Sequence, residues 1–158
     1  MIDFYNETSY REYFSNLASE MAGISAFKYG DKDAKAISAR SDISEGATLW
    51  LDYMPLISGS GEHDHVVGEI TASFVVMKPA SDRHDTEEEQ EQKKAECTAL
   101  VLEIFRKVRA DWDAGTLGYV NEPRFNRLKF GSTDPISFGS SMFAGCAAEL
   151  PFIIPLNI

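Results

Sequence analysis

Asp85–Trp112 reads DTEEEQEQKKAECTALVLEIFRKVRADW, and this stretch decides the fold class. It contains neither glycine nor proline, and its first turns are acidic while Lys107 and Arg109 lie in later turns, the order that a helix dipole favours. Gly115 is placed to end the helix. In its second half the apolar residues follow the spacing of a helix that packs on a core with one face: Cys97, Leu100, Val101, Ile104, Phe105, Val108 and Trp112. Such a helix needs a surface to cover, and strand-like segments flank it.

The whole chain sets limits on the class of protein. Its 158 residues predict a single domain over residues 1–158. The net charge of −10 disfavours a sequence-specific nucleic-acid-binding role, because binding to phosphates needs a basic face. No membrane-spanning stretch and no secretory signal are visible near Met1–Glu7, and Cys97 and Cys146 fit reduced, buried thiols. A cytoplasmic protein is therefore expected.

A first helix is predicted upstream, over about Tyr10–Ala22. Ser9 and Glu12 have the spacing of a capping box, and Gly23 is placed to close the helix. The segment from Ile24 to Arg40 leaves two alternatives open: a short strand at Phe27–Tyr29, or one or two helical turns capped by Asp31.

Strand signals lie on both sides of the long helix. Thr48–Met54 and His65–Met77 predict an antiparallel hairpin with a flexible tip at Ser58–Glu62, and Ile70, Ala72, Phe74 and Val76 share one face. Downstream, Phe125–Phe130 and Ser141–Glu149 predict two strands around a turn at Gly131–Pro135, the last strand being rich in small residues that permit close approach. Together these segments predict an α+β fold in α-β-β-α-β-β order, with a mainly antiparallel sheet of about four strands packed by two main helices.

Residues that could carry chemistry are few. His63 and His65 would face the same side of a strand and are the candidate metal ligands, the alternative being a solvated polar loop. No nucleophile motif, reactive cysteine pair or phosphate-binding loop is recognisable. We therefore expect no enzymatic activity and no cofactor, although a site assembled from distant residues would leave no local motif.

The C-terminal segment is unusually apolar. Its prolines restrict it to a sheet edge or an extended arm. Two interpretations remain: the segment folds onto its own core, or it docks on a neighbouring subunit. The candidate interface residues are Phe152, Ile153, Ile154, Leu156 and Ile158.

Several phrases of this sequence resemble one family. They are Phe27–Asp31 followed by Ala36 and Ile37, then Thr48–Pro55, and finally Phe143–Phe152. In these phrases, in size and in the order of predicted elements, the chain is similar to phage tail-terminator or tail-completion proteins, also called minor tail proteins. The resemblance implies a prophage-like origin and a non-catalytic protein that forms a homo-oligomeric ring, often a hexamer. Such a ring caps the tail tube and contacts the head connector, so the protein would pass from the host cytoplasm into the virion tail.

Two other function classes stay open. The chain could be a small binding module of a mobile element, which uses its sheet face or the loop around residues 55–65 to hold a partner. It could also be a metal-dependent enzyme that uses His63 and His65. A ring former forms a high oligomer, a binding module stays small, and a metal enzyme carries an ion that is lost in His63→Ala.

Overall fold

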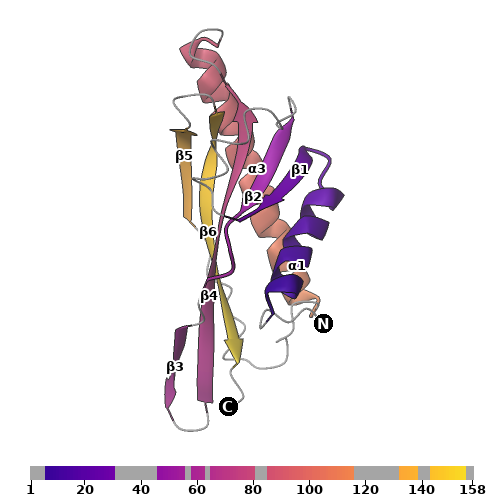
Figure 1. Cartoon of the computed structure of the whole chain (residues 1–158), viewed down its shortest axis with the longest axis vertical. Coiled ribbons are helices and arrows are strands. Elements are labelled where there is room, and N and C mark those ends of the chain that lie inside the picture. The colour runs from indigo at the N-terminus through magenta and orange to yellow at the C-terminus, as the bar shows by residue number, and fades with distance from the viewer. Residues whose placement is uncertain are drawn as a thin grey trace.

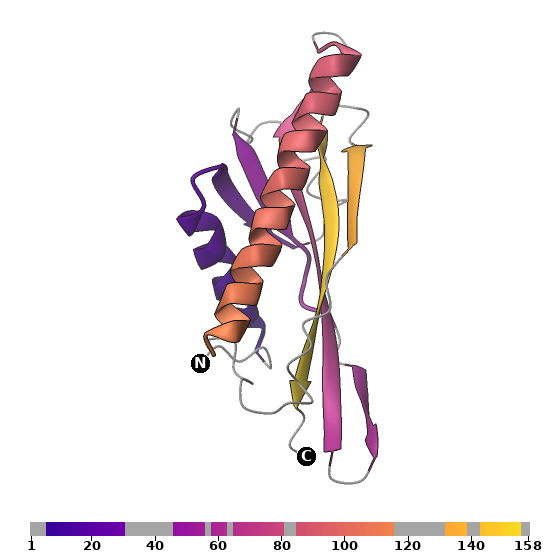
Figure 2. The ribbon, with the colours of Figure 1, turned by 180° about the vertical axis from the view of Figure 1, so that it is seen from behind.

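In the computed structural model, one sheet carries two helices on one of its faces (Figures 1 and 2). The structure describes residues 6–30, 46–55, 58–62, 65–80, 85–115, 132–138 and 143–155. Within them lie two helices, α1 (Glu7–Glu20) and α3 (Glu87–Asp113). The strands are β1 (Ile24–Tyr29), β2 (Ala47–Leu51), β3 (Ser58–Glu62), β4 (His65–Pro79), β5 (Ser132–Phe138) and β6 (Phe143–Pro155). The predicted α+β class with two main helices is confirmed.

The sheet is larger and less regular than predicted. Its strands follow the order β1-β2-β4-β6-β5, with β3 paired to β4 outside that path. The expectation of about four strands is therefore wrong, since six lie in the described residues. The sheet is also mixed, because β1 runs parallel to β2 whereas the remaining pairs are antiparallel. Phe27–Tyr29 is thus part of a strand, and the alternative of a cap at Asp31 lies outside the described residues.

Both helix starts are set by local hydrogen bonds. The side chain of Asn6 accepts from Thr8 N at 2.7 Å and begins α1, so the capping box predicted at Ser9 is wrong because the helix starts before it. α1 ends at Glu20, with Met21 as C-cap, earlier than Gly23 would place it. In α3, Thr86 and Glu89 form a reciprocal capping box, and Gly115 follows at a φ of 80°, the left-handed conformation that glycine adopts freely.

Two segments predicted as turns are strands. Ser58–Glu62 pairs with β4 as β3, with Glu62 opposite His65. The predicted turn at Gly131–Pro135 is wrong, because β5 begins at Ser132 and pairs with β6 from Ser132↔Glu149 to Phe138↔Phe143. Glycine and proline favour turns locally, but hydrogen bonding to a neighbouring strand can override this preference. Edge strands tolerate both residues. The predicted strand at Phe125–Phe130 lies outside the described residues.

The main core lies between the helices and one face of the sheet. The predicted inward residues of β4 are fully buried there, and Phe14 of α1 contacts Phe74, with ring centres 6.0 Å apart. The opposite face carries a smaller buried cluster: Trp50, Val75, Met77 and Phe143. Both faces of the sheet are thus apolar around its middle, which differs from the single covered face that the alternation of β4 predicts, because Val75 and Met77 are buried as well.

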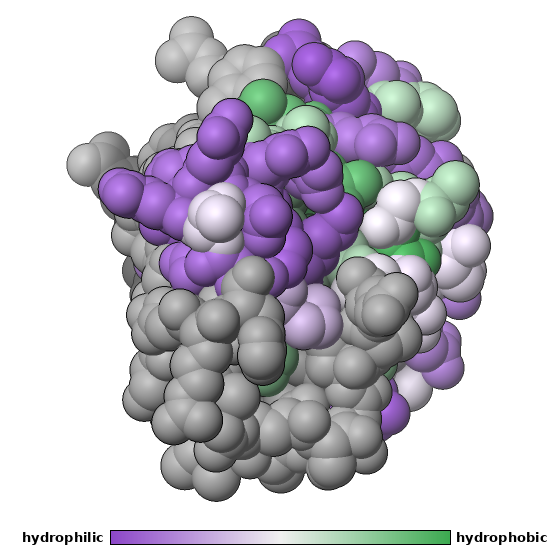
Figure 3. All heavy atoms as spheres, turned by 90° about the horizontal axis from the view of Figure 1, so that it is seen from above, coloured by the Kyte–Doolittle hydropathy of each residue, from purple (hydrophilic) through white to green (hydrophobic). Residues whose placement is uncertain are grey.

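β4 and β6 extend well past the helices. Their far ends pair from Val67↔Pro155 to Ile70↔Phe152, and β3 flanks β4 there. We call this projecting three-stranded part, formed by β3, residues 65–69 of β4 and residues 153–155 of β6, the arm; the rest is the body (Figures 1 and 2). At the opposite end, the first turns of α3 extend beyond the strands, and hydrophilic residues dominate the described surface there (Figure 3). The acidic start of α3 is solvent-exposed, since Glu87, Glu88 and Glu91 are exposed.

Candidate functional site

A groove between α1 and β1 is a candidate functional site in the described residues. It has a volume of about 540 Å³ and is lined by residues of α1 together with Tyr29 of β1. The residues from α1 recur at helical spacing, so they lie along one side of the helix: Glu7, Thr8, Arg11, Glu12 and Ser15. A smaller groove of about 170 Å³ also includes Ser15 and continues past Ile24–Phe27, so the seam between α1 and β1 is hollowed along its length.

Tyr29 organises one end of this groove. Its hydroxyl donates to Glu7 Oε1 at 2.7 Å and accepts from the backbone N–H of Met54 at 3.1 Å. The guanidinium of Arg11 lies over its ring, 5.4 Å from the centre, and the ring of Tyr53 meets it edge-on with centres 5.4 Å apart. Tyr53 itself is 60% exposed. Tyrosine and arginine are enriched among the residues that dominate binding energy at protein interfaces, so this end of the groove suits recognition.

The protonation state of Tyr29 also points to recognition rather than proton transfer. Burial, followed by the hydrogen bond to Glu7, raises the pKa of Tyr29 to about 12. Burial likewise raises the pKa of Tyr10 and of Tyr13, whose hydroxyl donates to Asp111 Oδ2 at 2.8 Å. All three hydroxyls therefore stay protonated near neutral pH, and none of them is poised as a general base.

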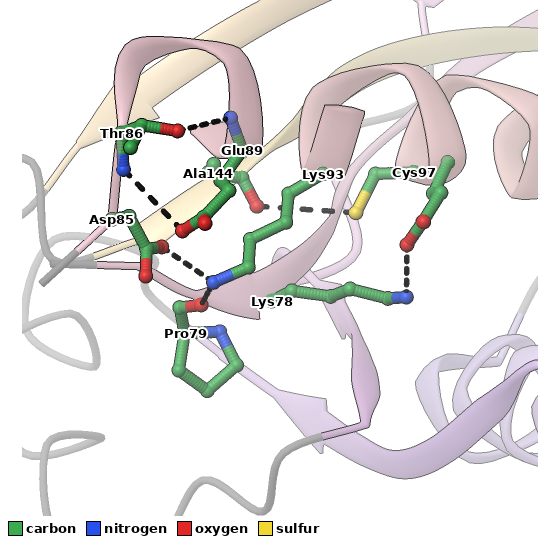
Figure 4. A network of polar contacts seen from close by, with 9 residues as sticks. Lys78, Pro79, Asp85, Thr86, Glu89, Lys93, Cys97 and Ala144 are labelled. Atoms are coloured by element: carbon green, nitrogen blue, oxygen red, sulfur yellow. Dashed lines mark hydrogen bonds and ion pairs between the residues drawn. The ribbon is translucent and has the colours of Figure 1, made fainter. Parts of the chain in front are cut away.

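A second polar cluster joins the end of β4 to the start of α3 (Figure 4). Lys93 Nζ donates to the carbonyl of Pro79 at 2.9 Å and to Asp85 Oδ2 at 2.5 Å, while Lys78 pairs with Glu96 at 2.5 Å. The pair lowers the pKa of Glu96 because the hydrogen bond from Lys78 favours the carboxylate. These contacts fasten a helix to a strand, and each charge is matched within the cluster, so its role is structural.

The two histidines predicted as metal ligands are not brought into any site by the described geometry. His63 lies outside the described residues, and of His65 the structure describes the backbone, opposite Glu62 at the start of β4. Among the described residues, no three His, Cys, Asp or Glu side chains are grouped so as to hold a metal ion. The metal-site hypothesis therefore stays untested. Cys97 and Cys146 are both free and buried, and the Sγ of Cys97 is 3.9 Å from the carbonyl oxygen of Ala144.

The candidate interface residues divide into those placed and those not described. Phe152 is 1% exposed and packs edge-on against Phe14, with ring centres 6.3 Å apart, so its side chain belongs to the core of its own chain. Ile153 and Ile154 continue β6 into the arm, at positions opposite Glu69 and Gly68. Leu156 and Ile158 lie outside the described residues. An interface role for this segment stays a prediction, now restricted to residues beyond Phe152.

Sequence reasoning missed the groove altogether. Its residues are polar and charged types that are common on any protein surface. Glu7 and Tyr29 are also far apart in the sequence, and they meet only because α1 packs antiparallel beside β1. The signal that could have found it is the i, i+4 spacing of Glu7, Arg11 and Ser15 on one side of α1.

Comparison with known proteins adds no relative. The sequence matches no protein-family model, and no curated protein matches it. The described helices include none that is both long and apolar enough to cross a membrane. The likeness to tail terminators therefore depends on the sequence phrases alone.

Proposed function

We propose that this chain is a structural assembly protein of the tail-terminator type. Its copies would form a homo-oligomeric ring, six copies being the expected number, which caps a tail tube and contacts the head connector. Such a protein is made in the host cytoplasm and ends in the virion tail, without catalysis, cofactor or nucleic-acid sequence recognition. The proposal combines the resemblance of the sequence phrases with one structural observation, the arm.

The arm supports assembly because it extends sheet beyond the helices that cover the body (Figure 1). Its strands include apolar residues, Val66 and Val67 in β4 and Ile153 and Ile154 in β6. A sheet normally covers its apolar residues with another layer, and neither described helix reaches the far end of the arm (Figures 1 and 2). A neighbouring copy would supply that layer, as expected of a subunit in a closed assembly.

The test is the molar mass in solution, measured by light scattering across concentration at moderate salt. The wild-type chain should reach a mass of about six copies, alone or with its tail-tube protein. The double variant Ile153→Ser, Ile154→Ser should lose this species while its circular dichroism is retained. Phe152→Ser is the matched control, since it removes a core contact and should lower stability instead. A chain that stays monomeric at every concentration, including on assembled tail tubes, would contradict the proposal.

The groove at Tyr29 favours a second candidate, a small binding module. Arg11 is held over an aromatic ring beside Glu7 and Glu12, so the groove presents donors, acceptors and an aromatic surface together. A peptide bearing both charge signs would suit it. Titration of such peptides, followed by NMR, should shift the amide signals of Arg11 and Tyr29 in the wild type but not in Arg11→Ala. This candidate also predicts a species of one or two copies rather than a ring.

A further inference from the structure

The two edges of the sheet differ in whether they can accept another strand. Whether an edge can accept a strand depends on which residues point their backbone N–H and C=O groups outward. The carbonyl of Ser73 in β4 accepts from Asp52 N at 2.9 Å, on the side of β2, so the odd-numbered residues of β4 face that side. The even-numbered residues therefore face β6. Because even residues of β4 stand opposite even residues of β6, the odd residues of β6 face away from β4.

On the β6 side, prolines occupy the outward positions. Among the described strands, β5 pairs with β6 no further than Glu149, so no described strand lies on the outer side of residues 150–155 of β6, where Pro151 and Pro155 are odd residues. In β5, the even residues stand opposite odd residues of β6, so Pro135 also faces outward. Proline has no N–H to donate, and each of the three removes a donor from this edge. Strand addition is blocked on this side of the sheet.

On the other side, no described strand covers the edge of the arm. Ser58, Ser60 and Glu62 of β3 stand opposite Glu69, Val67 and His65, so their backbone groups face β4. Gly59 and Gly61 consequently face outward, and both keep their N–H and C=O groups. Among the described strands, β4 alone pairs with β3. Neither proline nor lysine, the usual protections of an exposed edge, occurs in β3.

We propose that β3 pairs antiparallel with β3 of a second copy, about a two-fold axis at Ser60. In this register Gly59 stands opposite Gly61 of the partner subunit, and the two-fold axis creates the same pair a second time. The outward N–H and C=O groups of these glycines can then hydrogen-bond to each other across the two strands. The single charge of the strand, Glu62, then stands opposite Ser58 of the partner subunit. A parallel, in-register pair would instead place Glu62 beside Glu62 of the partner subunit, which is unfavourable. The two arms join into one continuous sheet. This pairing does not depend on the tail-terminator proposal.

The register is tested by cross-linking. In Ser60→Cys, the two thiols form a non-hydrogen-bonded pair on the axis, with Cα atoms about 4.5 Å apart, within reach of a disulfide. In the matched control Ser58→Cys, the Cα atoms lie four residues apart along the strand, or roughly 14 Å, beyond that reach. With oxidised glutathione taking up the two electrons, Ser60→Cys should yield covalent dimer and Ser58→Cys should not. The native Cys97 and Cys146 are buried and do not interfere.

The edge itself is tested by light scattering and sedimentation. Gly61→Pro removes an outward N–H, as the natural prolines do on the other edge, and should weaken dimerisation at least about tenfold. Gly61→Ala keeps the N–H and should dimerise as the wild type does, because Gly61 is not among the glycines with positive φ. Three results would each overturn the pairing. They are equal cross-linking of the two cysteine variants, a wild type that stays monomeric up to about 100 μM, and unchanged dimerisation of a folded Gly61→Pro variant. If Gly61→Pro fails to fold, the cysteine pair decides. A ring that survives Gly61→Pro would overturn the pairing and leave the tail-terminator proposal standing.

Discussion

β4 and β6 pass through two different surroundings, the body and the arm. In the body, their inward residues are buried beneath α1 and α3, from Ala72 to Val76 on β4 and from Cys146 to Leu150 on β6. In the arm, the same two strands continue past Ile70 and Phe152 with β3 as their flanking strand and no described helix upon them. The buried contacts of the body therefore stabilise the fold, whereas the arm offers strands and surface that other chains can contact.

The largest expected effect is the difference in stability loss between a substitution in the body, at Phe74, and one in the arm, at Gly59. Phe74 is fully buried and contacts Phe14 and Phe105, with ring centres 6.0 and 6.4 Å away. Phe74→Ala should lower the free energy of unfolding by about 3–5 kcal/mol, because it leaves a cavity in a packed core. Gly59→Ala, at an outward position of the arm, should change it by less than about 0.5 kcal/mol. Chemical denaturation measures both, and similar losses in the two variants would show that the arm also carries the fold.

A smaller effect is expected where strands pack closely within the body. A Cβ added at Gly145 would lie 2.3 Å from the carbonyl oxygen of Val76 and 3.0 Å from Met77 Cα, so the backbone itself would have to move. Gly145→Ala should therefore cost about 1–3 kcal/mol of stability.

Gly23→Ala is the matched control for that substitution. Its added Cβ would meet Leu100 Cδ2 at 2.6 Å, the end of a side chain that can rotate away, so its cost should be under about 1 kcal/mol. The ranking of the two thermal midpoints checks the prediction. A milder effect at Gly145 than at Gly23 would contradict the close approach of β6 to β4.

The body could be predicted from the sequence far better than the arm. The periodic stripe of α3 and the alternation of β4 report burial on one face, and burial is what the body provides. Gly145 fits the small-residue pattern noted in the last strand. The arm gave no such signal, because Ser58–Glu62 has the composition of a turn and becomes a strand only by pairing with β4.

Three further features escaped sequence reasoning for physical reasons. The parallel pairing of β1 and β2 is a matter of topology, which local propensity does not encode. The local sequence predicts a turn at Pro135, whereas β5 tolerates this proline at a position that faces the outer edge. The groove at Tyr29 depends on the packing of α1 beside β1, so its residues carried no local motif.

The smallest expected effect concerns the boundary between body and arm. Tyr29 lies there, holding Glu7 of α1 and the backbone N–H of Met54, where the chain leaves β2 on its way to β3. Tyr29→Phe removes both hydrogen bonds and should cost about 0.5–1.5 kcal/mol. Tyr53→Phe is the control, since it keeps the ring contact with Tyr29 and should leave stability unchanged. Faster hydrogen exchange at the Met54 amide in Tyr29→Phe alone would locate the loss at this boundary.

The same hydroxyl gives the boundary a dependence on pH. The pKa of Tyr29 is raised from 10.0 to about 12 in the folded chain, so its protonated form is favoured by folding. Its contribution to stability is therefore complete below pH 10 and is lost as the pH rises from about 10 through 12. Tyr10 and Tyr13 shift in the same direction, so the wild type and Tyr29→Phe should both lose stability in this range, the variant less steeply. Parallel curves for the two proteins would contradict the raised pKa of Tyr29, and with it the burial and the hydrogen bond to Glu7 that raise it.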